Sequence, residues 1–143
     1  SNSYEFVKTA RMFECYERNV AAMIGLSTAV QYLSKLGINA IEERTSHLSS
    51  SLIAGLSELK DIKVLEKSRH RSSIITFTKG NIDAKILRDE LKKRNINVSV
   101  CKQQNSQLDL GTELTGDVTR VSLHYYNTQQ EISEFLQALE EIR

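Results

Sequence analysis

The sequence predicts an α+β fold in which two long helices precede a small mixed or antiparallel sheet of three to four strands, with helices packed on one face. Apolar residues recur at helical spacing over residues 20–36 and again over 39–59. Four later segments have the alternation or the β-branched composition of strands, and helical segments lie between and after them. This order, helices first and then alternating strands and helices, predicts one α+β domain that includes both long helices.

The two long helices have recognisable ends. Asn19 is a predicted N-cap, and Gly37 is a predicted stop for the first helix. Small residues such as Gly25 would let another element approach this helix closely. Asn39 and Glu42 resemble a capping box for the second helix, whose polar side predicts a place on the surface of the domain.

Each later element is predicted from a short local pattern. Asp83 is a predicted cap for a helix over 82–94, and Thr128 with Glu131 fits the T-x-x-E capping box of a last helix over 128–142. Within the third strand candidate, alternation places Ser99 and its polar neighbours on one face. The four strand candidates are residues 62–66, 72–79, 96–101 and 119–126.

Composition narrows the function classes. The chain has 143 residues, 26% of them charged, and a net charge of +1 without a run of five like charges, so we predict neither a nucleic-acid nor a membrane partner. Two cysteines cannot form a disulfide framework, so we predict a reducing, cytoplasmic location. No cluster of residues has metal-ligand spacing, and there is no P-loop or G-x-G-x-x-G segment, so we predict no metal site.

The last strand candidate carries an arginine. Alternation places Arg120, Ser122, His124 and Tyr126 on one face of this strand. Such a face points to solvent, to a partner domain or to a ligand, and on the residues alone a solvated polar face is the favoured interpretation.

Three segments of the chain, taken together, resemble a known family. They are RMFECYERNVAAMIGLSTAVQYLSKLG, RNINVSV and TRVSLHYYNTQQEI. They are similar to the C-terminal part of class V aminotransferase-fold enzymes, which include cysteine desulfurases, selenocysteine lyases and isopenicillin N epimerase-like proteins. The resemblance covers nearly the whole chain, which corresponds to roughly the last third of such an enzyme, a single small domain in length.

The resemblance implies a fold, a cofactor and partners. The fold is the small C-terminal domain of fold-type I enzymes, here residues 19–143, with residues 1–18 connecting it to a missing large domain. The cofactor is pyridoxal phosphate, the substrate is an amino acid, and the full-length parent is a homodimeric, cytoplasmic transferase or lyase.

The resemblance also implies a substrate site. The family's strand arginine binds the α-carboxylate of the substrate, and Arg120 occupies its place here. A planar guanidinium matches a carboxylate with two parallel hydrogen bonds, which a lysine cannot form. We therefore predict Arg120, Ser122 and His124 as substrate-binding residues of the parent.

A second family pattern, F-E-x-G-T-x-N, supplies a threonine to the cofactor phosphate of the neighbouring subunit. Phe13, Glu14 and Asn19 match this pattern, but the threonine is absent. Arg18 and Asn19 are candidate contacts with the phosphate held by the partner subunit. Whether Glu17, Arg18 and Asn19 replace the family's contact stays open.

The chain differs from the family in two ways that affect the predicted activity. Desulfurases carry a nucleophilic cysteine in the loop between the last two strands, whereas this loop has none and Cys101 falls at the end of a strand. We therefore predict that the parent is not a desulfurase. The lysine that holds the cofactor lies on the family's large domain, so we predict no catalytic residue in this chain and no activity for the chain alone.

Several alternatives stay open at this point. Transamination, elimination and racemisation share the same substrate-carboxylate arginine, and the substrate side chain is not specified. The competing interpretation is a free-standing α+β regulatory module that binds a small molecule or a protein without catalysis. That interpretation does not explain why Arg120, the Tyr-Asn-Thr turn and the Phe-Glu segment occur together in the family's order.

Overall fold

The computed structural model describes residues 3–15, 17–65, 72–105 and 116–142. It divides into two compact units, Ser1–Ile38 and Asn39–Arg143. The predicted boundary between residues 18 and 19 concerns the domains of a parent protein and stays a prediction.

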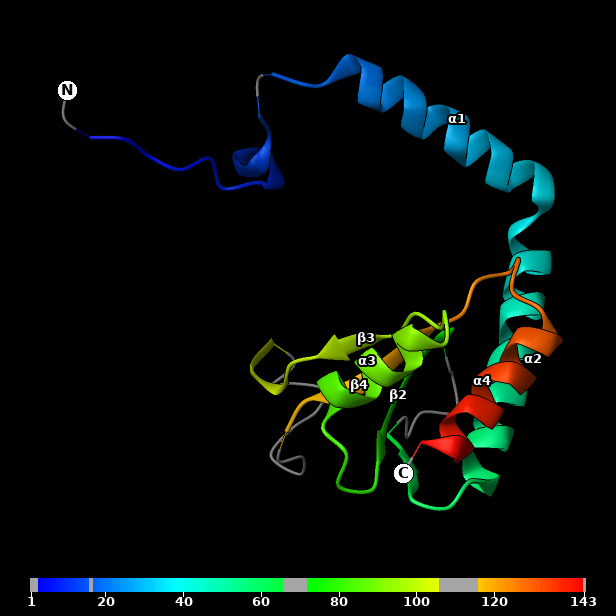
Figure 1. The fold of residues 1–143 in the computed structure, drawn as a ribbon. Coiled ribbons are helices and arrows are strands. Elements are labelled where there is room, and N and C mark those ends of the chain that lie inside the picture. The colour runs from blue at the N-terminus through cyan, green and yellow to red at the C-terminus, as the bar shows by residue number, and fades with distance from the viewer. Residues whose placement is uncertain (1–2, 16, 66–71, 106–115, 143) are drawn as a thin grey trace. The chain divides into compact units, whose positions relative to one another are not determined.

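The first unit consists of a short 3-10 helix, η1 (Ala10–Phe13), and the helix α1 (Val20–Leu36) (Figure 1). Both predicted ends of α1 are confirmed. The Oδ1 atom of Asn19 accepts a hydrogen bond from the backbone N–H of Ala22 at 2.9 Å. Gly37 ends the helix with φ of 88°, a conformation that glycine adopts without steric cost.

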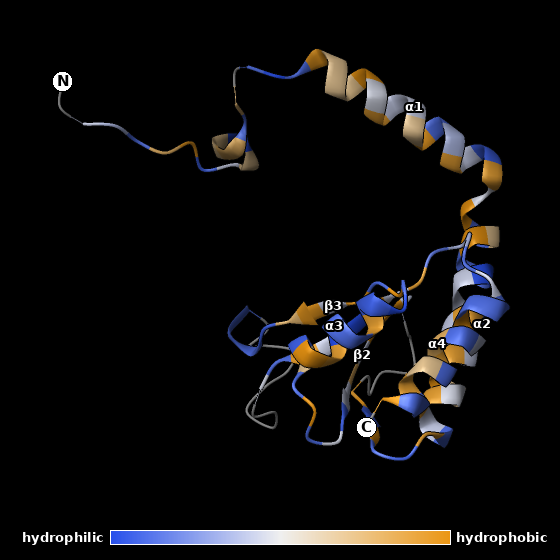
Figure 2. Ribbon diagram, in the orientation of Figure 1, coloured by the Kyte–Doolittle hydropathy of each residue, from blue (hydrophilic) through white to orange (hydrophobic). Residues whose placement is uncertain are grey.

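No described side chain of this first unit is buried. Val20, Ile24 and Leu26 of α1 are 65%, 64% and 65% exposed. Figure 2 shows apolar residues along α1. Nothing lies within 4 Å of a Cβ atom placed on Gly25. Within its own unit, therefore, the helix has no packing partner.

The helix α2 (Ile38–Glu58) begins one residue after Gly37. The predicted capping box of Asn39 and Glu42 is wrong, because Asn39 already lies in the first turn of α2. The single glycine ends α1, and α2 begins at the next residue, so no loop residue remains in which Asn39 could act as a cap.

The second unit contains the predicted sheet, with four strands that all pair antiparallel. The strands are shorter than predicted. Their spatial order is β1 (Ile62–Val64), β2 (Ile74–Lys79), β4 (Val118–Ser122) and β3 (Ser99–Cys101). The strands β2 and β4 are therefore central, and β1 and β3 are edge strands.

Three helices cover one face of this sheet, as predicted. They are α2, α3 (Ala84–Lys93) and α4 (Gln129–Glu141) (Figure 1). Their apolar faces share a single core with Ile75 and Phe77 of β2, and the rings of Phe77 and Phe135 meet edge to face with centroids 6.2 Å apart. The core cluster comprises Leu48, Leu52, Ile53, Leu56, Ile75, Phe77, Leu87, Leu91, Ile132, Phe135, Ala138, Leu139 and Ile142.

Side-chain caps set the ends of these helices, and a glycine allows two of them to pack closely. Asp83 caps α3 through a hydrogen bond from the N–H of Lys85 to Oδ1 at 2.8 Å, which confirms its predicted role. The helices α2 and α4 meet at Gly55, where any Cβ atom would collide with Leu136. None of the described helices has the length and the apolar composition needed to cross a bilayer.

Candidate functional site

Arg120 lies on the face of the sheet that the helices leave uncovered. Its strand neighbours Thr119 and Val121 pair with Phe77 and Ile75, whose side chains are in the core. Because successive side chains of a strand point to opposite faces, Arg120 points away from that core. The second unit thus has a sheet with one face covered by helices and a second face, which carries the guanidinium of Arg120 and the buried side chain of Val118.

The Nε atom of Arg120 is buried, yet it has no hydrogen-bond partner among the described residues. Buried polar atoms are nearly always paired, because an unpaired donor loses its hydrogen bonds to water without replacement. An unpaired guanidinium nitrogen at a sheet surface is therefore suited to a ligand that brings its own acceptor.

Two neighbours flank Arg120 across the sheet. Arg120 stands directly opposite Thr76 of β2 on one side and Ser99 of β3 on the other. Directly opposed residues of an antiparallel pair point to the same face. This row of Thr76, Arg120 and Ser99 was not foreseen as a unit, since the alternation of each strand is visible in the sequence but the pairing between strands is not.

Of the other two predicted substrate-binding residues, Ser122 lies in β4 and His124 lies beyond its end. Ser122 follows Arg120 on the same face of β4 and is exposed. His124 is not in the strand, because β4 ends at Ser122 and His124 lies in the turn that follows. Its ring stacks on Tyr126 with centroids 4.3 Å apart. The prediction that His124 and Tyr126 continue the strand face of Arg120 is wrong.

A hydrogen-bond network explains why the strand ends where it does. The side chain of Asn127 accepts from the N–H of His124 at 2.8 Å, and the N–H of Asn127 donates to the carbonyl of His124 at 3.0 Å. These two bonds close a tight turn. Arg44 of α2 donates to the carbonyl of Asn127 at 2.8 Å and ties the turn to the core helices.

Thr128 and Glu131 form the predicted capping box at the start of α4. The Oγ1 atom of Thr128 accepts from the N–H of Glu131 at 3.2 Å, and Glu131 accepts from the N–H of Thr128 at 2.7 Å. This backbone hydrogen bond, followed by the bond from the side chain of Asn127, lowers the pKa of Glu131 below its ordinary value of 4.5. Asn127 and Thr128 thus have structural roles that hold the end of the arginine strand.

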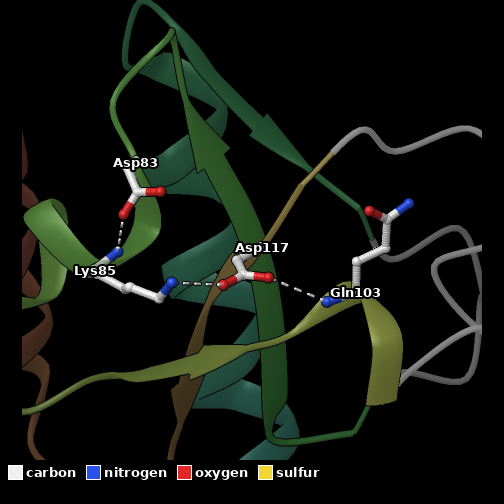
Figure 3. Close-up of polar contacts among 4 residues, drawn as sticks. All are labelled: Asp83, Lys85, Gln103 and Asp117. Carbon is white, nitrogen blue, oxygen red and sulfur yellow. Dashed lines mark hydrogen bonds and ion pairs between the residues drawn. The ribbon is translucent and has the colours of Figure 1, made fainter.

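Asp117 holds the other end of β4. One of its carboxylate oxygens accepts from the N–H of Gln103 at 3.3 Å, and the other lies 3.4 Å from the Nζ of Lys85 (Figure 3). Asp117 therefore connects the start of the arginine strand to α3 and to the segment that follows β3.

The predicted phosphate residues lie in the first unit. The Oδ1 atom of Asn19 is committed to the cap of α1, which leaves its amide nitrogen as a donor. Arg18 is exposed immediately before this helix N-terminus. Both side chains therefore have N–H groups that could donate hydrogen bonds to an anion. The backbone N–H groups of a first helical turn also favour anions.

A groove of about 880 Å³ lies in the second unit, beside the C-terminal end of β4. Ile96, Val98 and Phe135 contribute to its apolar lining, Ser122 and Glu131 to its polar lining, and Arg120 is not part of it. Because Ser122 also follows Arg120 on β4, the groove reaches the end of the arginine strand. In the described part of the chain, no three His, Cys, Asp or Glu residues lie together as metal ligands would.

The sequence profile of the family described as aminotransferase class V matches residues 1–135. The chain belongs to this family. Pyridoxal phosphate is the cofactor of the family, and the fold and the resemblance predicted from the three segments are confirmed.

The curated relatives are longer proteins. A probable cysteine desulfurase of Methanothermobacter thermautotrophicus is 28% identical over 136 residues, which cover 91% of this chain and 33% of that protein. A probable cysteine desulfurase of Borreliella burgdorferi is 29% identical over 132 residues, or 91% of this chain and 31% of that protein. The chain thus spans about a third of the length of the curated relatives it matches.

Solved structures share the fold. The apo cysteine desulfurase of Thermococcus onnurineus matches with a TM-score of 0.79 at 23% identity, covering 97% of this chain and 35% of that one. The cystine C–S lyase C-DES, solved with cysteine persulfide, matches with a TM-score of 0.72 at 19% identity, covering 94% of this chain and 33% of that one.

These names bear on one earlier prediction. We predicted that the parent is not a desulfurase, because the loop between the last two strands lacks a cysteine. Most of that loop, residues 106–115, lies outside the described residues. The relatives are named probable cysteine desulfurases, so the comparisons do not support that prediction and we do not retain it.

Proposed function

We propose that this chain is the substrate-binding C-terminal part of a pyridoxal-phosphate enzyme that acts on an amino acid, with Arg120 binding the substrate carboxylate. The observation that supports the proposal is the buried Nε atom of Arg120, which has no hydrogen-bond partner among the described residues and lies on the sheet face away from the helices. Family membership supplies the class of enzyme and the cofactor.

The chemistry of the site follows from its donors. The guanidinium offers five N–H groups in a planar fork and always carries a positive charge. A carboxylate that accepts from Nε and from a neighbouring terminal nitrogen satisfies the unpaired donor with two charge-assisted bonds. Such a pair fixes the orientation of the carboxylate as well as its position.

The surroundings of Arg120 keep that orientation. Its strand is central in the sheet, Asp117 holds one end, and the turn at Asn127 holds the other. We propose that Ser122, which is exposed on the same face, and His124, whose ring is fixed by stacking on Tyr126, line the approach to the carboxylate. The rigid strand would place the guanidinium without a rearrangement on binding.

Pyridoxal phosphate, when bound, supplies an electron sink for the bonds to the substrate α-carbon. The residues of this chain that would contact it are Arg18 and Asn19, whose remaining donors suit a phosphate. We propose that they reach the phosphate held by a partner subunit, which makes the parent a homodimer. We also propose that the parent is cytoplasmic.

The carboxylate proposal is tested on this chain with uniform ¹⁵N labelling. The Nε–H resonance of Arg120 is observed in mildly acidic solution and assigned through Arg120→Lys, which removes it. L-Alanine is then added at constant ionic strength. We expect a saturable shift of this resonance, because the carboxylate would bring an acceptor to a donor that has no partner among the described residues.

Arg88 provides an internal control. Its Nε–H already donates to the carboxylate of Asp89 at 2.8 Å, so its resonance should stay nearly constant during the same titration. Equal and unsaturated shifts of both resonances would mean a general salt effect, and the carboxylate role of Arg120 would then be wrong.

We further propose that the family's cofactor lysine lies outside this chain and that the chain alone therefore has no enzyme activity. The purified chain is mixed with pyridoxal phosphate and reduced with borohydride, and the modified lysines are mapped by mass spectrometry. We expect slow labelling scattered over exposed lysines such as Lys92 and Lys93. Stoichiometric labelling of one lysine would contradict this prediction.

A further inference from the structure

We propose that Ser99 is a second substrate-contacting residue, whose hydroxyl donates to the same carboxylate that Arg120 binds. The inference rests on the proposed function and extends it to a residue on a different strand. It starts from the register of the sheet, in which Ser99 of β3 stands directly opposite Arg120 of β4.

The register brings the two side chains together. Directly opposed residues of an antiparallel pair have Cβ atoms about 4.5–5.5 Å apart and project from the same face. The next residue along, Val100, is opposite Thr119 and points to the covered side. A ligand that accepts from the guanidinium of Arg120 therefore lies within reach of the Ser99 hydroxyl.

The chemistry of a carboxylate leaves room for this second donor. An ionised carboxylate has two oxygens with about four lone-pair sites, and a guanidinium fork occupies about two of them. The remaining sites need other donors once water is displaced. A serine hydroxyl rotates freely and can donate to an oxygen whose position is set by the arginine.

The position of Ser99 in the sheet suits this role. The strand β3 is an edge strand, and the side chain of Ser99 is exposed, so a ligand can reach the hydroxyl without displacing another element. Thr76, the neighbour of Arg120 on the other side, already has an interaction of its own. Ser99 is therefore the flanking hydroxyl that we assign to the ligand.

The test compares two variants of nearly equal shape in the full 143-residue chain. Ser99→Thr keeps the hydroxyl, and Ser99→Val replaces it with a methyl group. Both residues favour strands, so β3 should form in each. The probe is L-alanine, and the readout is the dissociation constant obtained from the Nε–H resonance of Arg120.

We expect Ser99→Val to raise the dissociation constant about two- to tenfold, as the loss of one partly exposed hydrogen bond does. Ser99→Thr should bind within about twofold of the unmodified chain, since its hydroxyl is retained. Ser133→Ala is the matched control, because it removes a hydroxyl on α4 that donates to the carbonyl of Gln129. Its dissociation constant should be unchanged.

The outcomes separate the two proposals. If the Arg120 resonance saturates equally in Ser99→Val and Ser99→Thr, Ser99 does not contact the carboxylate, while the role of Arg120 stands. If the resonance of the unmodified chain does not respond to L-alanine at all, both proposals are wrong. If Ser99→Val alone weakens binding and the backbone amide spectrum of β3 is preserved, the inference is supported.

Discussion

The helices α1 and α2 differ in burial, although only Gly37 separates them in the chain. Both have apolar residues at helical spacing. In α2, five residues are buried, among them Leu48, Leu52 and Leu56, whereas α1 has no buried residue. Apolar periodicity therefore shows that a helix has a face to bury, but it does not show which element covers that face. For α2 the covering elements lie in the same unit, whereas no described residue of its unit buries the apolar side chains of α1.

The largest expected effect on stability comes from truncating a leucine to alanine, a change that can be made in each of the two helices. Leu52→Ala should lower the free energy of unfolding of the second unit by about 2–5 kcal/mol, because it leaves a cavity in the core. Leu26→Ala makes the same chemical change at a side chain that is 65% exposed, and it should cost less than about 0.5 kcal/mol. Urea unfolding followed by circular dichroism measures both. Equal losses would mean that α1 is packed in solution.

A glycine substitution sharpens the same comparison. Gly55→Ala should destabilise the second unit by about 1–3 kcal/mol, because the new methyl group collides with Leu136 and pushes α2 from α4. Gly25→Ala meets open space and should favour α1 by about 0.5–1 kcal/mol through the helix propensity of alanine. Both effects are read from thermal unfolding and helical content. A stabilising Gly55→Ala would show that the two helices separate readily.

The smallest expected effect is the pH dependence of the stability that Glu131 contributes. The folded chain lowers the pKa of Glu131 below 4.5, chiefly through the N–H of Thr128. A carboxyl with a lowered folded pKa contributes stability that is complete above its unfolded pKa. This contribution disappears as the pH falls below about 4.5 and through the lowered folded value. Glu131→Gln should lack this contribution, so its stability and that of the unmodified chain should converge at low pH.

Helix α1 provides the contrast for that measurement, since its cap is the neutral Asn19 and its first turn has no acidic residue. The amide resonances of its first turn should therefore change less over the same pH range than those of α4. A constant difference between Glu131→Gln and the unmodified chain at all pH values would contradict the role of this carboxyl.

Local signals in the sequence predicted most of the fold. The caps at Asn19, Asp83 and Thr128 are confirmed, because each depends on a side chain and on backbone groups within three residues of it. The end of the last strand was predicted four residues too late. Two adjacent tyrosines favour a strand, but the side chain of Asn127 bonds to the backbone of His124 and makes a turn instead.

The candidate site was predicted only in part, for a similar reason. Alternation within one strand placed Arg120 and Ser122 on the same face, which requires no knowledge of other elements. The neighbours of Arg120 across the sheet depend on register, which is set by contacts between residues far apart in the chain. Ser99 could be assigned to a polar face from the sequence, but not to the side of the arginine.

The hydrogen bond between Asp117 and Gln103 has a consequence for how this part of the chain can change in length. It joins two residues that flank positions 104–116, and it adds a side-chain link to the backbone pairing of β3 with β4. The entropy of closing a flexible loop grows only slowly, by about 0.6 kcal/mol for each doubling of its length. Insertions or exchanged sequences between these anchors should therefore cost little stability. Exchanged sequences between these anchors could carry new reactive groups while the arginine strand itself is preserved.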